Sequence, residues 1–235
     1  MELVTRARRA FYNLDGPWHR NRLFEALGSQ RYARPALFGL DRMLAELMPW
    51  RGGTFLEAGA HDGFTQSNTY FLERHLGWTG ILVEPVPELA RKCSLRRPAS
   101  RVVECALVGP EHASDSVQIH FGDLMSTTGD PTHAAQGLEV AGRGAYSIAV
   151  AARTLDSVLD QGATEPLDVI VLDLEGRECD VLRGLDLERH GPRYLLIEAL
   201  DLERARPSLN ALLADHYQPR DPPSGYDLIY ARRRS

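Results

Sequence analysis

The stretch Thr54-Phe-Leu-Glu-Ala-Gly-Ala-His-Asp-Gly63 decides the fold that the sequence predicts. Residues 54–58 combine apolar side chains with a small final residue, which is typical of a short buried strand. Gly59 and Gly63 follow, and residues 64–74 have the pattern of a helix. Together they predict the first half of a nucleotide-binding βαβ unit, because glycine admits a close ligand and a helix N-terminus offers free N–H groups.

The next strand ends in an acid that suits a ribose. Residues 80–84 read as a strand, and Glu84 at its tip is placed to hold the two hydroxyls of an adenosyl ligand. The dinucleotide fingerprint has three glycines, whereas only Gly59 and Gly63 are present here. The pattern therefore favours an adenosyl ligand without a diphosphate, of which S-adenosylmethionine is the common one. An ordinary strand–turn–helix with structural glycines is the alternative.

Strands and helices alternate through the rest of the chain. We expect further strands at residues 101–108, 115–121, 147–151, 167–173, 193–198 and 226–230, and helices at residues 87–97, 154–160, 179–185 and 208–216. This alternation predicts an α/β fold with a doubly wound, mostly parallel sheet. Residues 122–144 are polar and rich in small residues, and we expect this long loop to border the substrate site.

The chain divides into an N-terminal helical extension, residues 1–50, and one domain, residues 51–235. Helices are expected at residues 6–12, 19–27 and 36–48, and the last should pack on the sheet edge or cover the cofactor as a lid. The extension contains aromatic residues that either pack in the core or stack on a sugar ring: Tyr12, Trp18, Tyr32 and Trp50.

Composition indicates a cytoplasmic enzyme. A length of 235 residues suits one α/β domain with additions, and a net charge of -5 gives no reason to expect a nucleic acid or membrane partner. The three cysteines are widely spaced, so neither a zinc site nor a disulfide framework is expected. The sequence shows neither a signal peptide nor an apolar run long enough to span a membrane.

Four acids fall at or near the carboxyl ends of predicted strands, namely Glu57, Glu84, Asp173 and Glu198. Ligands of doubly wound sheets bind outside these ends. Four carboxylates on one edge would repel one another unless a cation lay among them. The sulfonium and ammonium groups of S-adenosylmethionine, or a divalent metal, would supply that positive charge.

A series of motifs runs through the chain in the following order: Phe55-Leu-Glu-Ala-Gly-Ala-His-Asp-Gly63 with residues 64–73, Leu76-Gly-Trp-Thr-Gly-Ile-Leu-Val-Glu-Pro85, residues 123–126, residues 154–156, Ile170-Val-Leu-Asp-Leu-Glu-Gly176, residues 181–184, 196–198 and 225–230. In this order the motifs resemble the FkbM family of S-adenosylmethionine-dependent methyltransferases. The resemblance covers residues 53–232. It implies a Rossmann-like class I methyltransferase fold and O-methylation, typically of a hydroxyl on a sugar or on a glycosylated or polyketide natural product. One departure is Val171, where many relatives have a lysine.

The resemblance also implies cofactor-binding residues. The methionine end of the cofactor would be lined by Glu57, Gly59, Ala60, Asp62 and Gly63. Glu84, with Pro85 beside it, would hold the ribose. The adenine would lie near Cys105, Ala106, Asp123, Met125 and Ser126.

Three acids are candidate catalytic residues. Asp173 and Glu198 would end neighbouring strands about 5 Å apart, a separation that suits two oxygen ligands of one Mg²⁺ ion. Glu175 is a candidate general base or metal ligand. Alternatively, Asp173 contacts the cofactor or caps a helix, Glu198 holds a loop, and Glu175 caps the helix that follows. His61 and His133 are further candidate bases, although a lone loop histidine is usually solvated.

The sequence thus predicts a sugar O-methyltransferase that acts on an oligosaccharide or polysaccharide precursor, with metal assistance. Its partner is then a carbohydrate, and the protein could act as a homodimer. A glycosylated or polyketide acceptor is the alternative within the class. A nicotinamide-dependent oxidoreductase or epimerase is disfavoured by the missing glycine. A non-catalytic binding module is disfavoured by the four acids at strand ends.

Overall fold

A computed structural model describes residues 15–161 except 121–146, and residues 167–233 except 200 and 222–223. Its main sheet has the strand order β3-β2-β1-β7-β8-β10-β9. These strands are Arg101–Val103, Thr79–Val83, Thr54–Ala58, Val169–Leu172, Tyr194–Glu198, Asp227–Arg232 and Tyr217–Pro219. All neighbouring strands are parallel except that β10 runs antiparallel to β8 and β9. The predicted doubly wound, mostly parallel sheet is confirmed.

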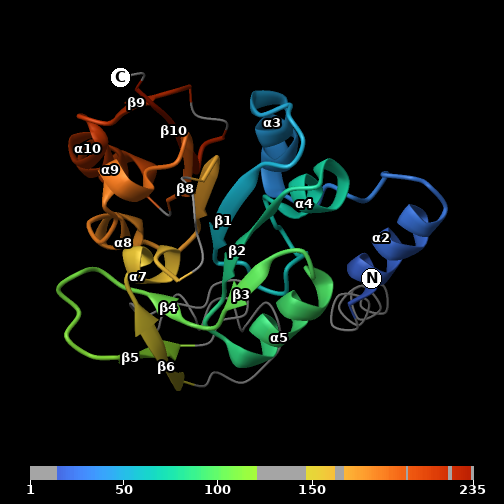
Figure 1. Cartoon of the computed structure of the whole chain (residues 1–235), viewed down its shortest axis with the longest axis horizontal. Helices are drawn as coiled ribbons and strands as arrows, with labels where there is room; N and C mark the ends of the chain where they lie inside the picture. The colour runs from blue at the N-terminus through green and yellow to red at the C-terminus, as the bar shows by residue number, and fades with distance from the viewer. Residues whose placement is uncertain (1–14, 121–146, 162–166, 200, 222–223, 234–235) are drawn as a thin grey trace, which may run out of the picture.

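Helices cover both faces of this sheet (Figure 1). One face carries α7 (Leu155–Leu159), α8 (Glu178–Leu182), α9 (Leu187–His190) and α10 (Leu202–Leu213), and the other carries α3 (Leu40–Leu47), α4 (Tyr70–Leu76) and α5 (Pro87–Arg96). Along β1, Leu56 packs in the apolar core under α7, α8 and α10, and Phe55 packs in the core under α3, α4 and α5 on the other face. Both side chains are fully buried. A strand covered on both faces needs apolar residues at successive positions, which explains the continuous apolar runs in the sequence.

A second, three-stranded sheet flanks the main one. It has the order β4-β6-β5, formed by Ala106–Leu107, Ser147–Arg153 and Ser116–His120. The prediction of one strand over residues 101–108 was therefore wrong. The backbone N–H of Cys105 donates to the carbonyl of Val103 at 3.1 Å, and this tight turn carries the chain from the main sheet to the second one.

The N-terminal segment begins, within the described residues, with α2 (Gly16–Ala26), and a short 3-10 helix η1 (Leu37–Gly39) leads into α3. Leu40, Leu44 and Met48 are buried in the same core as Phe55, so α3 packs on the face of the sheet. The helix predicted at residues 6–12 lies outside the described residues.

The aromatic residues of this segment pack against protein rings: Trp18 against Phe64 and Tyr70, Tyr32 against Phe24, and Trp50 against Trp78. These contacts support the core-packing alternative for the three, and Tyr12 lies outside the described residues. None of the helices in the described part of the chain has the length and apolarity to cross a membrane.

Candidate active site

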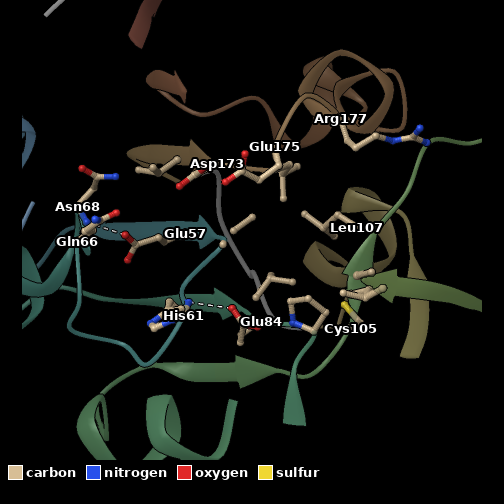
Figure 2. Close-up of a pocket in the computed structure, with 18 of the residues that line it drawn as sticks. Glu57, His61, Gln66, Asn68, Glu84, Cys105, Leu107, Asp173, Glu175 and Arg177 are labelled. Atoms are coloured by element: carbon tan, nitrogen blue, oxygen red, sulfur yellow. Dashed lines mark hydrogen bonds between the residues drawn. The ribbon is translucent and has the colours of Figure 1, made fainter. Parts of the chain in front are cut away.

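A cleft lies at the carboxyl ends of β1, β2 and β7, where doubly wound sheets bind their ligands. Figure 2 shows Glu57, Glu84 and Asp173 at the ends of three neighbouring strands, and all three residues line the cleft. Gln66 and Asn68 lie on one side of the cleft, and Cys105 and Leu107 lie on the other. Three of the four acids predicted at strand ends therefore line one cavity.

Glu84 joins the end of β2 to the glycine loop. Its carboxylate accepts the backbone N–H of His61 at 2.8 Å (Figure 2). It also accepts the backbone N–H of Val86 at 2.9 Å. The side chain is almost fully buried, and this burial raises the pKa of Glu84 to about 7. Two hydrogen bonds fix the carboxylate while each oxygen keeps a lone pair for a ligand.

Glu57 organises the loop that follows β1. Its carboxylate accepts hydrogen bonds from the Ser67 hydroxyl at 2.9 Å, the Asn68 backbone N–H at 2.7 Å and the Thr69 hydroxyl at 2.5 Å. These bonds hold residues 67–69 out of a helix, so α4 begins only at Tyr70. The prediction of a helix from residue 64 was wrong because Glu57 binds this backbone instead.

Arg97 is a structural residue of the site that sequence reasoning missed. Its side chain is fully buried; its guanidinium donates to Glu73 at 2.8 Å, to Thr69 at 2.9 Å and to the Gly63 carbonyl at 3.2 Å. It also lies 3.7 Å from the carboxylate of Glu57. Arg97 thus balances buried negative charge and ties α5 to the cofactor loop.

The remaining acids form a row across the sheet. Leu172 and Ile197 are partners in neighbouring parallel strands, so Asp173 and Glu198 follow side by side, and Asp227 of β10 is the partner of Glu198. Burial, followed by the charges of nearby acids including Glu198 and Glu175, raises the pKa of Asp173 well above its ordinary value. Burial and neighbouring acids also raise the pKa values of Glu198 and Glu175 to about 7. These carboxyl groups therefore keep their protons at pH values at which ordinary carboxyl groups are ionised, and a nearby cation would favour their ionised form.

The structure places Glu175 and Glu198 differently with respect to the cleft. Glu178 accepts the backbone N–H groups of Leu174 and Gly176, each at 3.0 Å, whereas the Glu175 Oε2 atom is buried without a hydrogen-bond partner among the described residues. Glu175 therefore lines the cleft instead of capping α8. Glu198 is not among the residues that line the cleft in the described chain.

The row does not form a complete metal site from protein groups. Among the described residues, no three His, Cys, Asp or Glu side chains gather at a spacing that could hold a metal ion. Asp173 and Glu198 would supply two oxygen ligands, whereas Mg²⁺ prefers six in octahedral geometry.

The loop residues predicted at the cofactor divide into two groups. Gly59 lines the cleft, whereas Ala60, Asp62 and Gly63 are not among its described lining residues. Asp62 accepts the backbone N–H groups of Phe64 and Thr65 and pairs with Arg96 at 2.5 Å. A Cβ atom at Gly63 would come within 2.9 Å of Arg97. Asp62 and Gly63 thus shape the loop and its contact with α5, and their predicted contact with the cofactor is not supported by this geometry.

The opposite wall of the cleft is mainly apolar. It contains three residues that were predicted to contact the cofactor, Pro85, Cys105 and Ala106. It also contains Leu107 and Ile119, which were not predicted. The last two escaped sequence reasoning because β4 and β5 reach the cleft only through the second sheet. The loop predicted at residues 122–144 lies outside the described residues. The same holds for the candidates within it, namely Asp123, Met125, Ser126 and His133.

Strained backbone gathers at the cleft. Five described residues other than glycine have positive φ angles, and three of them line the cleft: His61 at 49°, Gln66 at 58° and Glu175 at 52°. Such conformations cost about 1–3 kcal/mol each and cluster at functional sites. The gathering of three strained residues at the cleft therefore supports its role as a binding site.

Comparison with known proteins agrees with this geometry. The family described as Methyltransferase FkbM domain matches residues 57–216. No curated protein sequence matches the chain. The methyltransferase FkbM from Methylobacillus flagellatus is a similar solved structure, with 17% identity and a TM-score of 0.48 over 77% of this chain and 43% of that one. The chain thus spans less than half the length of that structure.

Two further solved structures are similar over most of the chain. A TehB-like SAM-dependent methyltransferase from Corynebacterium glutamicum has 14% identity and a TM-score of 0.45, over 97% of this chain and 99% of that one. The fibrillarin of Aeropyrum pernix, solved with natively bound S-adenosyl-L-methionine, has 14% identity and a TM-score of 0.43, over 81% and 72%. Because the family match covers more than half of the sequence, from the end of β1 to the end of α10, the chain belongs to the FkbM methyltransferase family.

Proposed function

We propose that the protein transfers a methyl group from S-adenosylmethionine to a sugar hydroxyl of an oligosaccharide or polysaccharide precursor. One observation carries this proposal: a single cleft at the carboxyl edge of the sheet is lined by the glycine turn at Gly59 and by four acids. These acids are Glu57, Glu84, Asp173 and Glu175. A donor with a sulfonium and an ammonium group would relieve the repulsion among these carboxylates.

The cleft offers a place for each part of the donor. Glu84, held by two backbone N–H groups, would accept the ribose hydroxyls with its remaining lone pairs. The apolar wall of Cys105, Leu107 and Ile119 would pack against the adenine. The Asn68 Oδ1 atom is buried without a partner among the described residues, and it would accept a hydrogen bond from the methionine ammonium.

S-adenosylmethionine supplies a methyl group on a sulfonium that leaves as a neutral thioether. The main task of the protein is to align the acceptor oxygen with the methyl carbon and the sulfur, because proximity supplies much of the rate of such a displacement. Glu175 would accept the hydroxyl proton, since its pKa is raised to about 7 and its buried oxygen lacks a partner in the described chain. Asp173 is the alternative base on the same edge.

Metal assistance is a separate part of the proposal. Asp173 and Glu198 lie on neighbouring strands and would hold Mg²⁺ only if water and the acceptor supplied the other oxygens. Methyl transfer in the presence of a chelator tests this part. Turnover that is unchanged by the chelator would remove the metal and leave the carboxylate base.

Activity on a panel of sugars tests the acceptor class. Radiolabelled S-adenosylmethionine should transfer its methyl group to at least one free or linked sugar. Transfer confined to polyketide or peptide acceptors without sugars would contradict the carbohydrate assignment and favour a natural-product acceptor. A glycosylated natural product that is methylated on its sugar would fit the same chemistry at the cleft.

A further inference from the structure

Two exposed aromatic rings stack on each other at the rim of the acid row. Phe38 of η1 and Tyr226, which precedes β10, have exposed fractions of 63% and 54%. Their ring centroids are 5.7 Å apart and their planes differ by 22°. Segments distant in the sequence thus meet in an aromatic pair that stays largely exposed to solvent, an arrangement that core packing does not explain.

The backbone at Phe38 is strained. It has a φ angle of 51° and a ψ angle of 11°, in the left-handed region that a bulky residue avoids. Phe38 is one of five described residues other than glycine with positive φ, and three of the others line the cleft. Burial does not compensate this strain, because most of the ring is exposed. Strained backbone positions cluster at binding sites, so Phe38 is a candidate for a residue that contacts a ligand.

The pair lies on the edge of the sheet that carries the acids. The carbonyl of Tyr226 accepts the Ala199 N–H at 2.9 Å, directly after β8, and Asp227 is the partner of Glu198. Strand β8 is next to β7, which ends beside Asp173. Two strand spacings separate Asp173 from Asp227, about 10 Å in total. This is a distance that two linked sugar rings can span.

We propose that Phe38 and Tyr226 form a stacking platform for a sugar unit next to the one that is methylated, with the partly exposed Glu198 accepting its hydroxyls. The C–H face of a sugar packs on an aromatic ring, and a carboxylate beside the ring suits its hydroxyl groups, as in sites that combine apolar surface with a few fixed polar groups. The inference rests on the proposed function and adds the place on the protein at which a second sugar unit of the acceptor binds. Two rings are too small a surface for a stable protein interface.

Binding of defined sugars to the full chain tests the platform. Saturation-transfer NMR would use glucose, galactose and mannose, their disaccharides maltose, lactose and mannobiose, and free p-nitrophenol, each with S-adenosylhomocysteine present. At least one disaccharide should bind more tightly than its monosaccharide. Phe38→Ala and Tyr226→Ala should each weaken that disaccharide about fivefold or more and leave S-adenosylmethionine affinity unchanged. Leu37→Ala, which removes a neighbouring exposed side chain, is the matched control.

Phe38→Gly separates binding from folding. Glycine adopts a positive φ angle without strain, so this variant should unfold at the same or a higher temperature while it loses disaccharide affinity. Three outcomes would contradict the platform. The disaccharides could bind the variants as tightly as they bind the wild type, the substitutions could weaken the binding of p-nitrophenol alone, or none of the six sugars could bind. Failure of S-adenosylmethionine itself to bind would instead refute the proposed function.

Discussion

Gly59 lies directly against the backbone of Asp173: a Cβ atom at position 59 would overlap the Asp173 carbonyl oxygen. The contact brings together the ends of β1 and β7, where the first glycine of the cofactor loop meets the first acid of the row. The glycine is therefore required by a close approach of two backbones as well as by its φ angle of 84°.

Gly59→Ala should cost more than the strain of its backbone. Gly28 is a matched control, because its φ angle is 77° and no atom lies within 4 Å of the Cβ position. We expect Gly28→Ala to lower the free energy of unfolding by about 1 kcal/mol, and Gly59→Ala to lower it further and to weaken S-adenosylmethionine binding at least tenfold. Chemical denaturation and calorimetry measure both effects. Equal losses in the two variants would show that the contact with Asp173 has no consequence.

Glu84→Gln should weaken the binding of S-adenosylmethionine. The amide keeps the shape of the side chain but loses the charge and one acceptor, so we expect a loss of about 1–3 kcal/mol in binding free energy. Glu88→Gln, on the exposed side of α5, is the control and should leave the dissociation constant unchanged. An unaltered dissociation constant in Glu84→Gln would refute the ribose role.

The affinity for S-adenosylmethionine should depend on pH. Burial raises the pKa of Glu84 to about 7, so the carboxyl is protonated at pH 6 and ionised at pH 8. The ionised form accepts both ribose hydroxyls, and the affinity should therefore rise as the pH increases through 7. Titrations between pH 6 and pH 8 should show a shallower rise in Glu84→Gln than in the wild type. Parallel curves would mean that other groups control this dependence.

Arg97→Met should destabilise the fold strongly. The substitution leaves the carboxylates of Glu57 and Glu73 buried without their cation, a change that typically costs about 3–5 kcal/mol. Arg91→Met removes an exposed arginine from the same helix and should cost less than about 0.5 kcal/mol. Thermal unfolding of the two variants decides between a structural network at Arg97 and an incidental contact.

Glu175→Gln should affect the reaction more than donor binding. Loss of a general base typically lowers kcat by about 10²–10⁴-fold. We expect the dissociation constant for S-adenosylmethionine to change by less than about threefold, because the ribose and adenine contacts stay intact. Glu111→Gln, an exposed substitution in a turn, serves as the control. Full activity in Glu175→Gln would transfer the role of base to Asp173.

Local sequence patterns predicted the central sheet because burial on both faces of a strand leaves a direct trace in composition. Residues 54–58 were predicted at their observed bounds. Glu84 and Asp173, which follow β2 and β7, and Glu198, which ends β8, lie at the expected edge. The break between β3 and β4 was missed because only the exposed Glu104 interrupts an otherwise apolar run, and one charged residue does not by itself predict a turn. The turn arises because β3 joins the main sheet and β4 joins the second sheet, and local sequence does not reveal which sheet a buried segment joins.

Long-range polar contacts also escaped prediction. Arg97 follows another arginine at the end of α5, and its position in sequence does not reveal that it reaches Glu73 and Thr69. The pairing of Phe38 with Tyr226 joins residues from opposite ends of the chain. Such contacts arise from packing of the whole domain, so residue type and spacing cannot specify them.

Calorimetric titration of the full chain with S-adenosylmethionine, and separately with NAD, tests the central claim that this rim of acids receives a cationic methyl donor. We predict one binding site for S-adenosylmethionine, tighter at pH 8 than at pH 6, and no binding of NAD. Tight binding of NAD without binding of S-adenosylmethionine would contradict the account.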